Sequence, residues 1–358
     1  MKVISVVGAR PEFIQAAPIS NALRLRHTEL LVHTGQHYDY EMSEVFFQQL
    51  SLPKPDYNLG VGSGSHAWQT GETLMRLEPV LKRERPDWVI VRGDTNSTLA
   101  GALAATKLCI PVAHVEAGLR SFNASMPEEI NRVATDHISD ILFCPTPAAM
   151  GNLKREGLVE RARLVGDVMY EATLYHLKMA KHQSNVMTRL SLRPNGYLLA
   201  TAHRAENTDN SQRLGGIVEA LNSIQEPVVF PVHPRTQAAL KRYSYTLGKH
   251  VQTVPPVSYF DMLMLEKNAR LVLTDSGGIQ KEAYCLGTPC ITLRDETEWV
   301  ETVEMGWNTL VGADPTAILE AVQHFQVSSE RPALYGDGKT SLHILEALED
   351  CVSKQSLC

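Results

Sequence analysis

Two short apolar runs, VIVRGD at 89–94 and PVAHVEAG at 111–118, decide the fold of this chain. Each is typical of a β-strand and ends on an acid, Asp94 in the first run and Glu116 in the second. The Ala- and Leu-rich segment 99–107 between them is typical of a crossover helix, which predicts parallel strands. Ligands of parallel α/β sheets bind outside the carboxyl ends of the strands. Asp94 and Glu116 are therefore expected to face a cleft and to offer proton-transfer chemistry.

Outward from these strands, strand and helix patterns alternate, and a polar helical stretch at 172–190 divides the chain into two series. Such alternation predicts an α/β protein with two Rossmann-like domains and an active site in the interdomain cleft. A length of 358 residues also favours two domains, expected at 1–170 and 187–335. The predicted strands lie at 2–7, 30–34, 88–92, 111–116, 140–144 and 162–165, and then at 197–201, 227–232, 251–254, 270–274 and 289–293.

Composition excludes several classes of function. The net charge is −6 and the chain has no basic run, which argues against a nucleic-acid surface. No window is long and apolar enough to span a bilayer, and the N-terminus is too briefly apolar for a signal peptide. The six cysteines show no CxxC spacing, which favours reduced thiols. We therefore expect a cytoplasmic protein that binds neither nucleic acid nor membrane.

The segment LVLTDSGGIQKEA at 271–283 has the pattern of a strand, a small-residue turn and a helix. Free backbone N–H groups at Ser276, Gly277 and Gly278 would attract a phosphate to the helix N-terminus. Glu282, about one helical turn further on, could accept hydrogen bonds from ribose hydroxyls. The alternative is an ordinary tight turn with Ser276 as a helix cap. The segment is not GxGxxG, so no nicotinamide cofactor is implied.

Three further residues follow predicted strands. Arg10 could grip a phosphate with two hydrogen bonds, and its alternative is a solvated surface arginine. His203 could protonate or hydrogen-bond a leaving phosphate, and His233, which follows the next strand, is a further candidate for the substrate site. For both residues the alternative is a structural role, which is the commoner one for a lone histidine. His33 and His37 have neither a third ligand nor a matching spacing, so no metal is predicted.

Seven ordered motifs, spread over nearly the whole chain, carry a family resemblance. They are GARPE (8–12), TGQH (34–37), GDT (93–95), HVEAGLR (114–120), PEEINR (127–132), HR with EN (203–207) and TDSGG (274–278). In these motifs the chain resembles the non-hydrolysing UDP-N-acetylglucosamine 2-epimerases. The resemblance implies a glycosyltransferase-B-like fold whose C-terminal helix, at about 341–358, returns to the N-terminal domain. It also implies a homodimer and no cofactor.

The resemblance further implies a reaction at carbon 2 of a UDP-sugar. UDP would be eliminated from UDP-N-acetylglucosamine to give a glycal, and UDP-N-acetylmannosamine would form after re-addition. Asp94, Glu116 and Glu128 occupy the family's acid–base positions, and crowding of like charges would let one acid keep its proton. The neighbouring Glu129 is expected to be a helix cap or a salt-bridge partner. The positions that match the family's UDP site are Arg10, His203, Ser276, Gly277, Gly278 and Glu282.

The chain departs from the family pattern at three places. Gln15 stands where the family usually has Lys, which removes a point charge from the phosphate or sugar site. Ala205 interrupts the usual His-Arg-Arg-Glu-Asn motif, and Asp39 replaces a Gln. Because both of the latter changes fall in the effector-sugar site of the regulated enzymes, we expect no substrate allostery.

Other functions remain open on the sequence. The segment 293–302, with 63–66 and 119–123, resembles a branch that includes epimerases of UDP-2,3-diacetamido-glucuronate. Arg294 in it could meet a sugar carboxylate or a phosphate, or form a salt bridge to Asp295 or Glu298. A retaining glycosyltransferase and a catalytically silent nucleotide-sugar sensor, the latter motivated by Gln15, are the alternatives from other classes.

Overall fold

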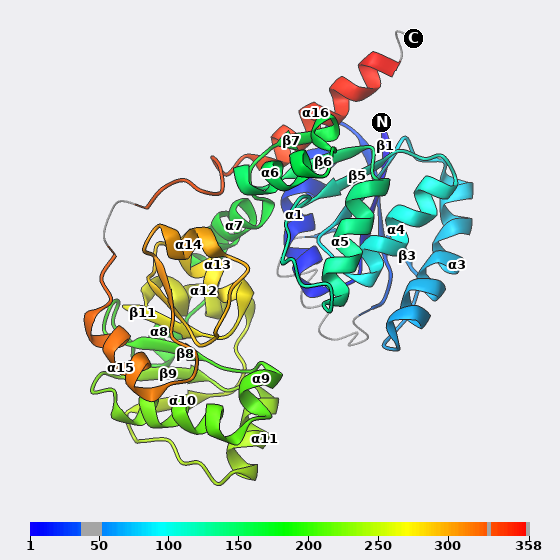
Figure 1. Cartoon of the computed structure of the whole chain (residues 1–358). Coiled ribbons are helices and arrows are strands. Elements are labelled where there is room, and N and C mark those ends of the chain that lie inside the picture. Colours follow the sequence, from blue (N-terminus) through cyan, green and yellow to red (C-terminus); the bar gives the residue numbers. More distant parts are fainter. Residues whose placement is uncertain (37–51, 328–330, 356–358) are drawn as a thin grey trace. The chain divides into compact units, whose positions relative to one another are not determined.

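The computed structural model describes residues 1–36, 52–327 and 331–355, except for the side chains of Arg10 and of residues 353–355. The chain divides into two compact units (Figure 1). Unit 1 comprises Met1–Ala172 and Ala333–Cys358, and unit 2 comprises Thr173–Pro332. Each unit contains one parallel β-sheet, so the prediction of a two-domain α/β protein is confirmed.

Unit 1 has a seven-stranded sheet in the order β3-β2-β1-β4-β5-β6-β7. The order reverses next to β1, which makes the carboxyl ends of β1 and β4 a topological switch point. The sequence did not predict β3, because this two-residue strand carries no apolar run. The strands are β1 (Lys2–Val7), β2 (Thr28–His33), β3 (Tyr57–Asn58), β4 (Trp88–Arg92), β5 (Val112–Val115), β6 (Ile141–Cys144) and β7 (Ala162–Leu164).

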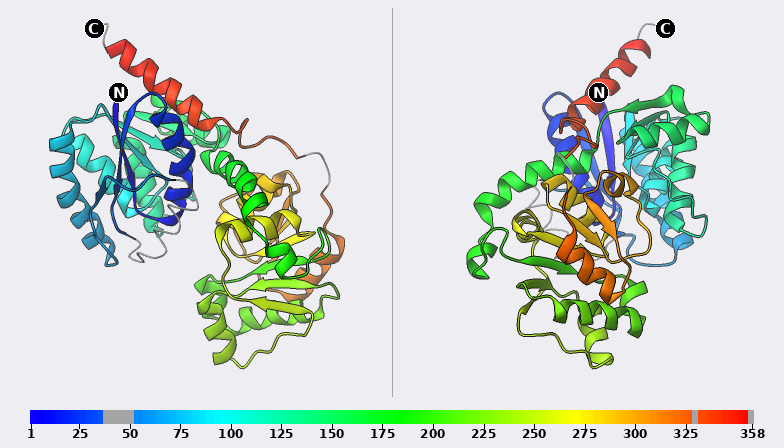
Figure 2. Two further views of the ribbon diagram at one scale, coloured as in Figure 1. Left: turned by 180° about the vertical axis from the view of Figure 1, so that it is seen from behind. Right: turned by 60° about the vertical axis from the view of Figure 1, so that its left-hand side comes forward.

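Helices cover both faces of this sheet because successive strand residues point to opposite sides. Val3 of β1 packs in the cluster that contains helix residues Ile19 and Ile344, whereas Ile4 packs with Leu77. The C-terminal helix α16 therefore lies beside α1 and packs its apolar face on the core of unit 1 (Figure 2). The helices are α1 (Arg10–Arg24), α3 (His66–Glu84), α4 (Asn96–Lys107), α5 (Pro127–Ile138), α6 (Pro147–Arg155), the 3-10 helix η1 (Val159–Arg161) and α16 (Thr340–Gln355).

Unit 2 has a six-stranded parallel sheet in the order β10-β9-β8-β11-β12-β13. Leu198 faces a core that includes Ile217 of α10 (Ser211–Ser223), and the next residue, Leu199, faces one that includes Ala283 of α13 (Gly277–Leu286). The sequence did not predict β13, which is short and begins with a polar residue. The strands are β8 (Leu198–Thr201), β9 (Val228–Pro231), β10 (Val251–Val254), β11 (Leu271–Thr274), β12 (Cys290–Thr292) and β13 (Asn308–Leu310).

The predicted helical stretch at 172–190 consists of two helices, α7 and α8. They separate because the Ser184 hydroxyl accepts a hydrogen bond from the Val186 backbone N–H, 3.3 Å away, and donates one to Asp261. None of the described helices is both long and apolar enough to cross a membrane. The remaining helices are α7 (Val168–Gln183), α8 (Val186–Arg189), α9 (Ala205–Thr208), α10 (Ser211–Ser223), α11 (Pro234–Arg242), α12 (Tyr259–Asn268), α13 (Gly277–Leu286), α14 (Val300–Glu304) and α15 (Pro315–His324).

Candidate active site

Asp94 and Glu116 follow the carboxyl ends of two paired strands in unit 1. Arg92, the last residue of β4, pairs with Val115, the last residue of β5. Both turns use left-handed backbone, with φ +69° at Gly93 and φ +68° at Glu116. A left-handed conformation is unusual for a residue with a side chain, and such residues cluster at functional sites. The structure thus brings the two predicted acids to the same edge of the sheet.

Asp94 is held by residues of α5. Its carboxylate forms an ion pair with Arg132, and the Asn131 side-chain amide donates to the Asp94 backbone carbonyl at 3.0 Å. Burial opposes the charge of Arg132, but the attraction of Asp94 and Glu129 outweighs burial and raises the pKa of Arg132. The Asp94 carboxylate is therefore fixed and partly charge-compensated.

Glu116 contacts Gln15, which the sequence analysis placed in the phosphate or sugar site. The Gln15 side-chain amide donates to a Glu116 carboxylate oxygen, with 2.5 Å between Nε2 and Oε2. Gln15 is only 3% exposed. In this chain a neutral amide therefore stands beside the carboxylate, at the position where the family resemblance implies a lysine.

The adjacent acids Glu128 and Glu129 differ in their surroundings. Glu129 accepts hydrogen bonds from the backbone N–H groups of Ser121 (2.9 Å) and Phe122 (3.0 Å) and pairs with Arg132, so its predicted structural role is confirmed. Glu128 is an exposed residue on the first turn of α5 and has no hydrogen-bond or ion-pair partner among the described residues. Its carboxylate is available to an incoming molecule.

Glu12 is a carboxylate of this region that the sequence analysis missed. It is 2% exposed and accepts hydrogen bonds from the Gly8 and Ala9 backbone and from the Thr95 and Thr98 hydroxyls. Burial raises its pKa despite these four donors. Glu12 thus ties the turn after β1 to the loop that follows Asp94. Its place at the third position of α1, where a capping acid is common, was the available signal. The side chain of Arg10 lies outside the described residues.

The expected phosphate turn in unit 2 forms as a strand–turn–helix. Ser276 is the N-cap of α13, and its hydroxyl lies 3.5 Å from the Ile279 N–H, as the capping alternative predicted. Gly277 is approached closely by a side chain, because a Cβ built on it would lie 1.9 Å from Oε1 of Glu298. A carboxylate of the protein itself therefore lies over the N-terminus of α13, where backbone N–H groups favour an anion.

Two arginines hold Glu298 in this place. Arg294 Nη1 lies 2.8 Å from one Glu298 oxygen and Arg204 Nη2 lies 3.8 Å from the other. Burial opposes the charge of Glu298, but Arg294 outweighs burial and lowers the pKa of Glu298. Arg294 is 6% exposed, and its Nε has no hydrogen-bond partner among the described residues. Of the possibilities left open for Arg294, the structure contains the salt bridge to Glu298.

The predicted histidines lie together beside a buried acid. The rings of His203 and His233 are 5.5 Å apart, and Nδ1 of His233 accepts the Arg235 N–H as the cap of α11. The backbone N–H of His203 donates to Asp275, which is fully buried. Burial lowers the pKa of His203, although Asp275 opposes this, so the imidazole is uncharged at neutral pH. The sequence analysis assigned no role to Asp275, whose carboxylate holds the backbone that carries His203.

Glu282 lies in a buried acidic cluster on the helices α12 and α13. Glu282 is 8% exposed. The pKa of the neighbouring Glu266 is raised well above the ordinary value, mainly because Glu266 is buried and also because the charge of Glu282 is close. Glu266 is fully buried, and neither of its carboxylate oxygens has a hydrogen-bond partner among the described residues. Glu266 therefore keeps a proton to higher pH than an exposed glutamate does.

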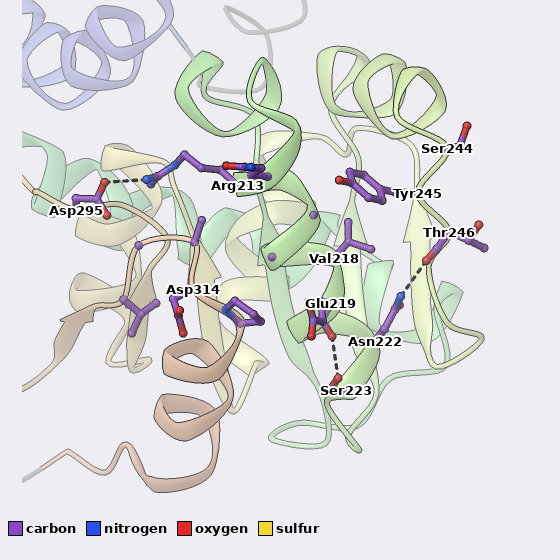
Figure 3. Close-up of a pocket in the computed structure, with 17 residues that line it drawn as sticks. Arg213, Val218, Glu219, Asn222, Ser223, Ser244, Tyr245, Thr246, Asp295 and Asp314 are labelled. Atoms are coloured by element: carbon purple, nitrogen blue, oxygen red, sulfur yellow. Dashed lines mark hydrogen bonds and ion pairs between the residues drawn. The ribbon is translucent and has the colours of Figure 1, made fainter.

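An open pocket lies elsewhere on unit 2, over α10 (Figure 3). At its edge Arg213 pairs with Asp295 at 2.8 Å and donates to the Asn207 side chain at 3.0 Å. None of the site residues predicted from the sequence lines this pocket. Across the described part of the chain, no group of three or more His, Cys, Asp or Glu side chains could hold a metal ion. His37, one of the two histidines considered for a metal, lies outside the described residues.

Comparison with known proteins finds relatives that match nearly the whole chain. A homologue of UDP-N-acetylglucosamine 2-epimerase from Methanococcus maripaludis is 51% identical and covers 98% of this chain and 100% of its own length. The UDP-2,3-diacetamido-2,3-dideoxy-D-glucuronate 2-epimerase of Pseudomonas aeruginosa is 50% identical, with 97% and 99% covered.

The fold agrees with a solved structure. The crystal structure of Methanocaldococcus jannaschii UDP-GlcNAc 2-epimerase in complex with UDP-GlcNAc and UDP has a TM-score of 0.86 and 47% identity. The match covers 98% of this chain and 99% of that one. The family model described as UDP-N-acetylglucosamine 2-epimerase matches residues 21–349. The chain therefore belongs to the UDP-N-acetylglucosamine 2-epimerase family.

Proposed function

We propose that this protein is an isomerase that interconverts UDP-N-acetylglucosamine and UDP-N-acetylmannosamine. The observation that carries the proposal is the pair of acids, Asp94 and Glu116, at the ends of two adjacent parallel strands. A binding protein has no need of such a pair, whereas removal and return of a carbon-bound proton requires a base and an acid. Membership of the epimerase family supports the same reaction.

The reaction is proposed to proceed by elimination and re-addition. A carboxylate of the set Asp94, Glu116 and Glu128 takes the proton from carbon 2 while the bond between carbon 1 and the UDP oxygen breaks. The electron pair of the carbon–hydrogen bond becomes the double bond of the glycal, and UDP leaves with the electrons of the carbon–oxygen bond. A second acid then returns a proton to the opposite face of carbon 2, and UDP adds back to carbon 1.

Unit 2 is proposed to supply the groups that bind UDP. Backbone N–H groups at Gly277 and Gly278 and the dipole of α13 would stabilise the departing diphosphate. The N–H of Ser276, the helix cap, donates to the Thr274 hydroxyl at 3.0 Å. The uncharged His203 would act there as a hydrogen-bond donor. The other proposed contacts are Arg10 to the diphosphate, Glu282 to the ribose, His233 and Arg294 to the UDP-sugar, and Gln15 to the phosphate or the sugar beside Glu116.

A second substrate is supported by the 50% identity to the diacetamido-glucuronate epimerase. Its sugar carboxylate would compete with Glu298 for Arg294, which lies 2.8 Å from Glu298. The reaction at carbon 2 is the same, so the two proposals differ only in the sugar. We also propose a homodimer, which the family resemblance implies, and a cytoplasmic location, which the composition favours. The described cysteines are all free thiols, as a reducing compartment favours.

The test is to incubate the protein with each UDP-sugar in heavy water and to follow carbon 2 by proton NMR. We expect the carbon-2 proton signal of the accepted substrate to disappear as solvent deuterium is incorporated and the second epimer forms. UDP binding without deuterium incorporation into either sugar would overturn the epimerase proposal and favour a sensor. Transfer of the sugar to an acceptor would favour a glycosyltransferase.

A further inference from the structure

A buried charged network lies beneath the turns that carry Asp94 and Glu116. The side chains of His114 and Asp136 are fully buried and that of Arg120 is 2% exposed. Asp136 accepts hydrogen bonds from His114 Nδ1 at 2.7 Å and from Arg120 Nη1 at 2.7 Å. Burial opposes ionisation of Asp136, but these two partners outweigh burial and hold the pKa of Asp136 below its usual value. Asp136 is therefore a carboxylate at neutral pH.

The network ends on the backbone next to Asp94. His114 Nε2 lies 2.8 Å from the carbonyl oxygen of Gly93. A carbonyl only accepts hydrogen bonds, so His114 donates from Nε2 and, because Asp136 is ionised, also from Nδ1. Asp136 also accepts the backbone N–H of Gly118 at 3.1 Å, two residues after Glu116. The buried cluster of His114, Asp136 and Arg120 thus makes hydrogen bonds to the turn that carries Asp94 and to the turn that carries Glu116.

We propose that His114 is a positioning residue that fixes Asp94 through the Gly93 carbonyl, with Asp136 and Arg120 as its anchor. Hydrogen bonds to two neighbouring backbone carbonyls fix the turn. His114 donates to the carbonyl of Gly93, and the Asn131 side chain donates to the carbonyl of Asp94. Arg120 extends the anchor to Glu156 through two hydrogen bonds of 2.8 and 2.7 Å. The proposal rests on the proposed function, since it concerns how the Asp94 carboxylate is positioned for proton transfer. A misplacement of about 1 Å at a catalytic group can lower the rate by about a hundredfold.

Two substitutions at His114 separate its two hydrogen bonds. In His114→Gln the side-chain amide reaches the position of Nε2 and keeps a donor on Gly93, while Asp136 keeps Arg120 and Gly118. In His114→Asn the amide reaches the position of Nδ1 and keeps Asp136, while the Gly93 carbonyl loses its partner. The two variants are otherwise alike in polarity and charge, so each is the control for the other.

The experiment measures kcat, KM and the dissociation constant of UDP for the wild-type protein and both variants. We expect kcat of His114→Asn to fall about a hundredfold and that of His114→Gln to stay within about fivefold of wild type, with KM and UDP binding unchanged. Equal losses of kcat in the two variants, or a normal kcat in His114→Asn, would overturn the proposal. A wild-type protein with no exchange at carbon 2 would instead refute the proposed function.

A third variant keeps the proposal testable if His114→Asn does not fold. Arg120→Lys preserves the charge beside Asp136 but loses the two-bond contact with Glu156. We expect kcat to fall about three- to tenfold with KM unchanged, because the anchor loosens while the donors of His114 remain. A change in KM or UDP binding with normal kcat would contradict a role in aiming Asp94.

Discussion

The Gln15 side-chain amide donates a hydrogen bond to the Glu116 carboxylate, with 2.5 Å between the two atoms. The two residues are 101 positions apart in the sequence, and Gln15 is almost completely buried. A neutral donor stabilises the carboxylate less than an ammonium group would, because it lacks the charge. The residue at position 15 is therefore in a place to set the proton affinity of a proposed acid–base group.

Substitution of Gln15 should move the pH dependence of the reaction. In Gln15→Lys the nearby cation favours the charged form of Glu116, so the limb of the kcat–pH profile that reports Glu116 should move about one pH unit lower. This direction holds whether Glu116 acts as base or as acid. In Gln15→Met the hydrogen bond is lost, and the same limb should move to higher pH. Profiles from deuterium exchange at carbon 2 give the measurement, and shifts of the same sign in both variants would contradict the assignment.

The carboxylate of Glu298 should compete with UDP for the N-terminus of α13. It lies over Gly277 and is paired with Arg294 and Arg204. In Glu298→Gln the negative charge is removed, so the dissociation constant of UDP should decrease about three- to tenfold by calorimetry. Glu296→Gln, an exposed neighbour in the same loop, is the matched control and should bind UDP as wild type does. Weaker binding in Glu298→Gln would mean that Glu298 instead aligns Arg294 for the nucleotide.

The sheets were largely predictable because buried parallel strands are continuous apolar runs, such as 88–91, and their order in the chain dictates a doubly wound sheet. The short strands β3 and β13 lack such a run. They form because the edge of an existing sheet offers unpaired backbone groups, which is a tertiary effect.

The candidate site was predictable only in part. Asp94 and Glu116 follow strands, so the topology alone places them at one edge. The hydrogen bond from Gln15, the burial of Glu12 and the position of Glu298 depend on how distant segments pack, and no local pattern encodes them. Arg294 shows the same limit, since its partner Glu298 was one of several alternatives on the sequence.

Glu266 should make the stability of the protein depend on pH. Burial and the charge of Glu282 raise its pKa in the folded chain, so folding favours the protonated form. Glu266 stabilises the folded chain fully at pH values below its pKa in the unfolded chain, which is about 4.3. This stabilisation decreases as the pH rises towards its pKa in the folded chain. Glu266→Gln removes this titration. We expect its melting temperature to match wild type at pH 4 and to exceed it by about 2–6 °C at pH 7.5.

Calorimetry at the two pH values checks this prediction. Glu219→Gln is the control, because Glu219 is an exposed glutamate of the same unit and its substitution should alter neither value. A melting-temperature difference between Glu266→Gln and wild type that is the same at both pH values would show that folding does not raise the pKa of Glu266, and would contradict the prediction.

The enzyme should bind its substrate at one site per chain and without cooperativity. Ala205 interrupts the motif of the regulated enzymes, and Asp39, the second departure, lies outside the described residues. The remaining polar groups of that motif are already engaged, because Arg213 donates to Asn207 at 3.0 Å and pairs with Glu206 at 3.3 Å. An allosteric effect needs a second site whose occupancy changes the first. Initial rates against UDP-N-acetylglucosamine should therefore be hyperbolic, with a Hill coefficient of about 1, and calorimetry should give about one bound molecule per chain. A sigmoidal rate curve together with a second bound molecule would show that Arg213 yields to an effector sugar.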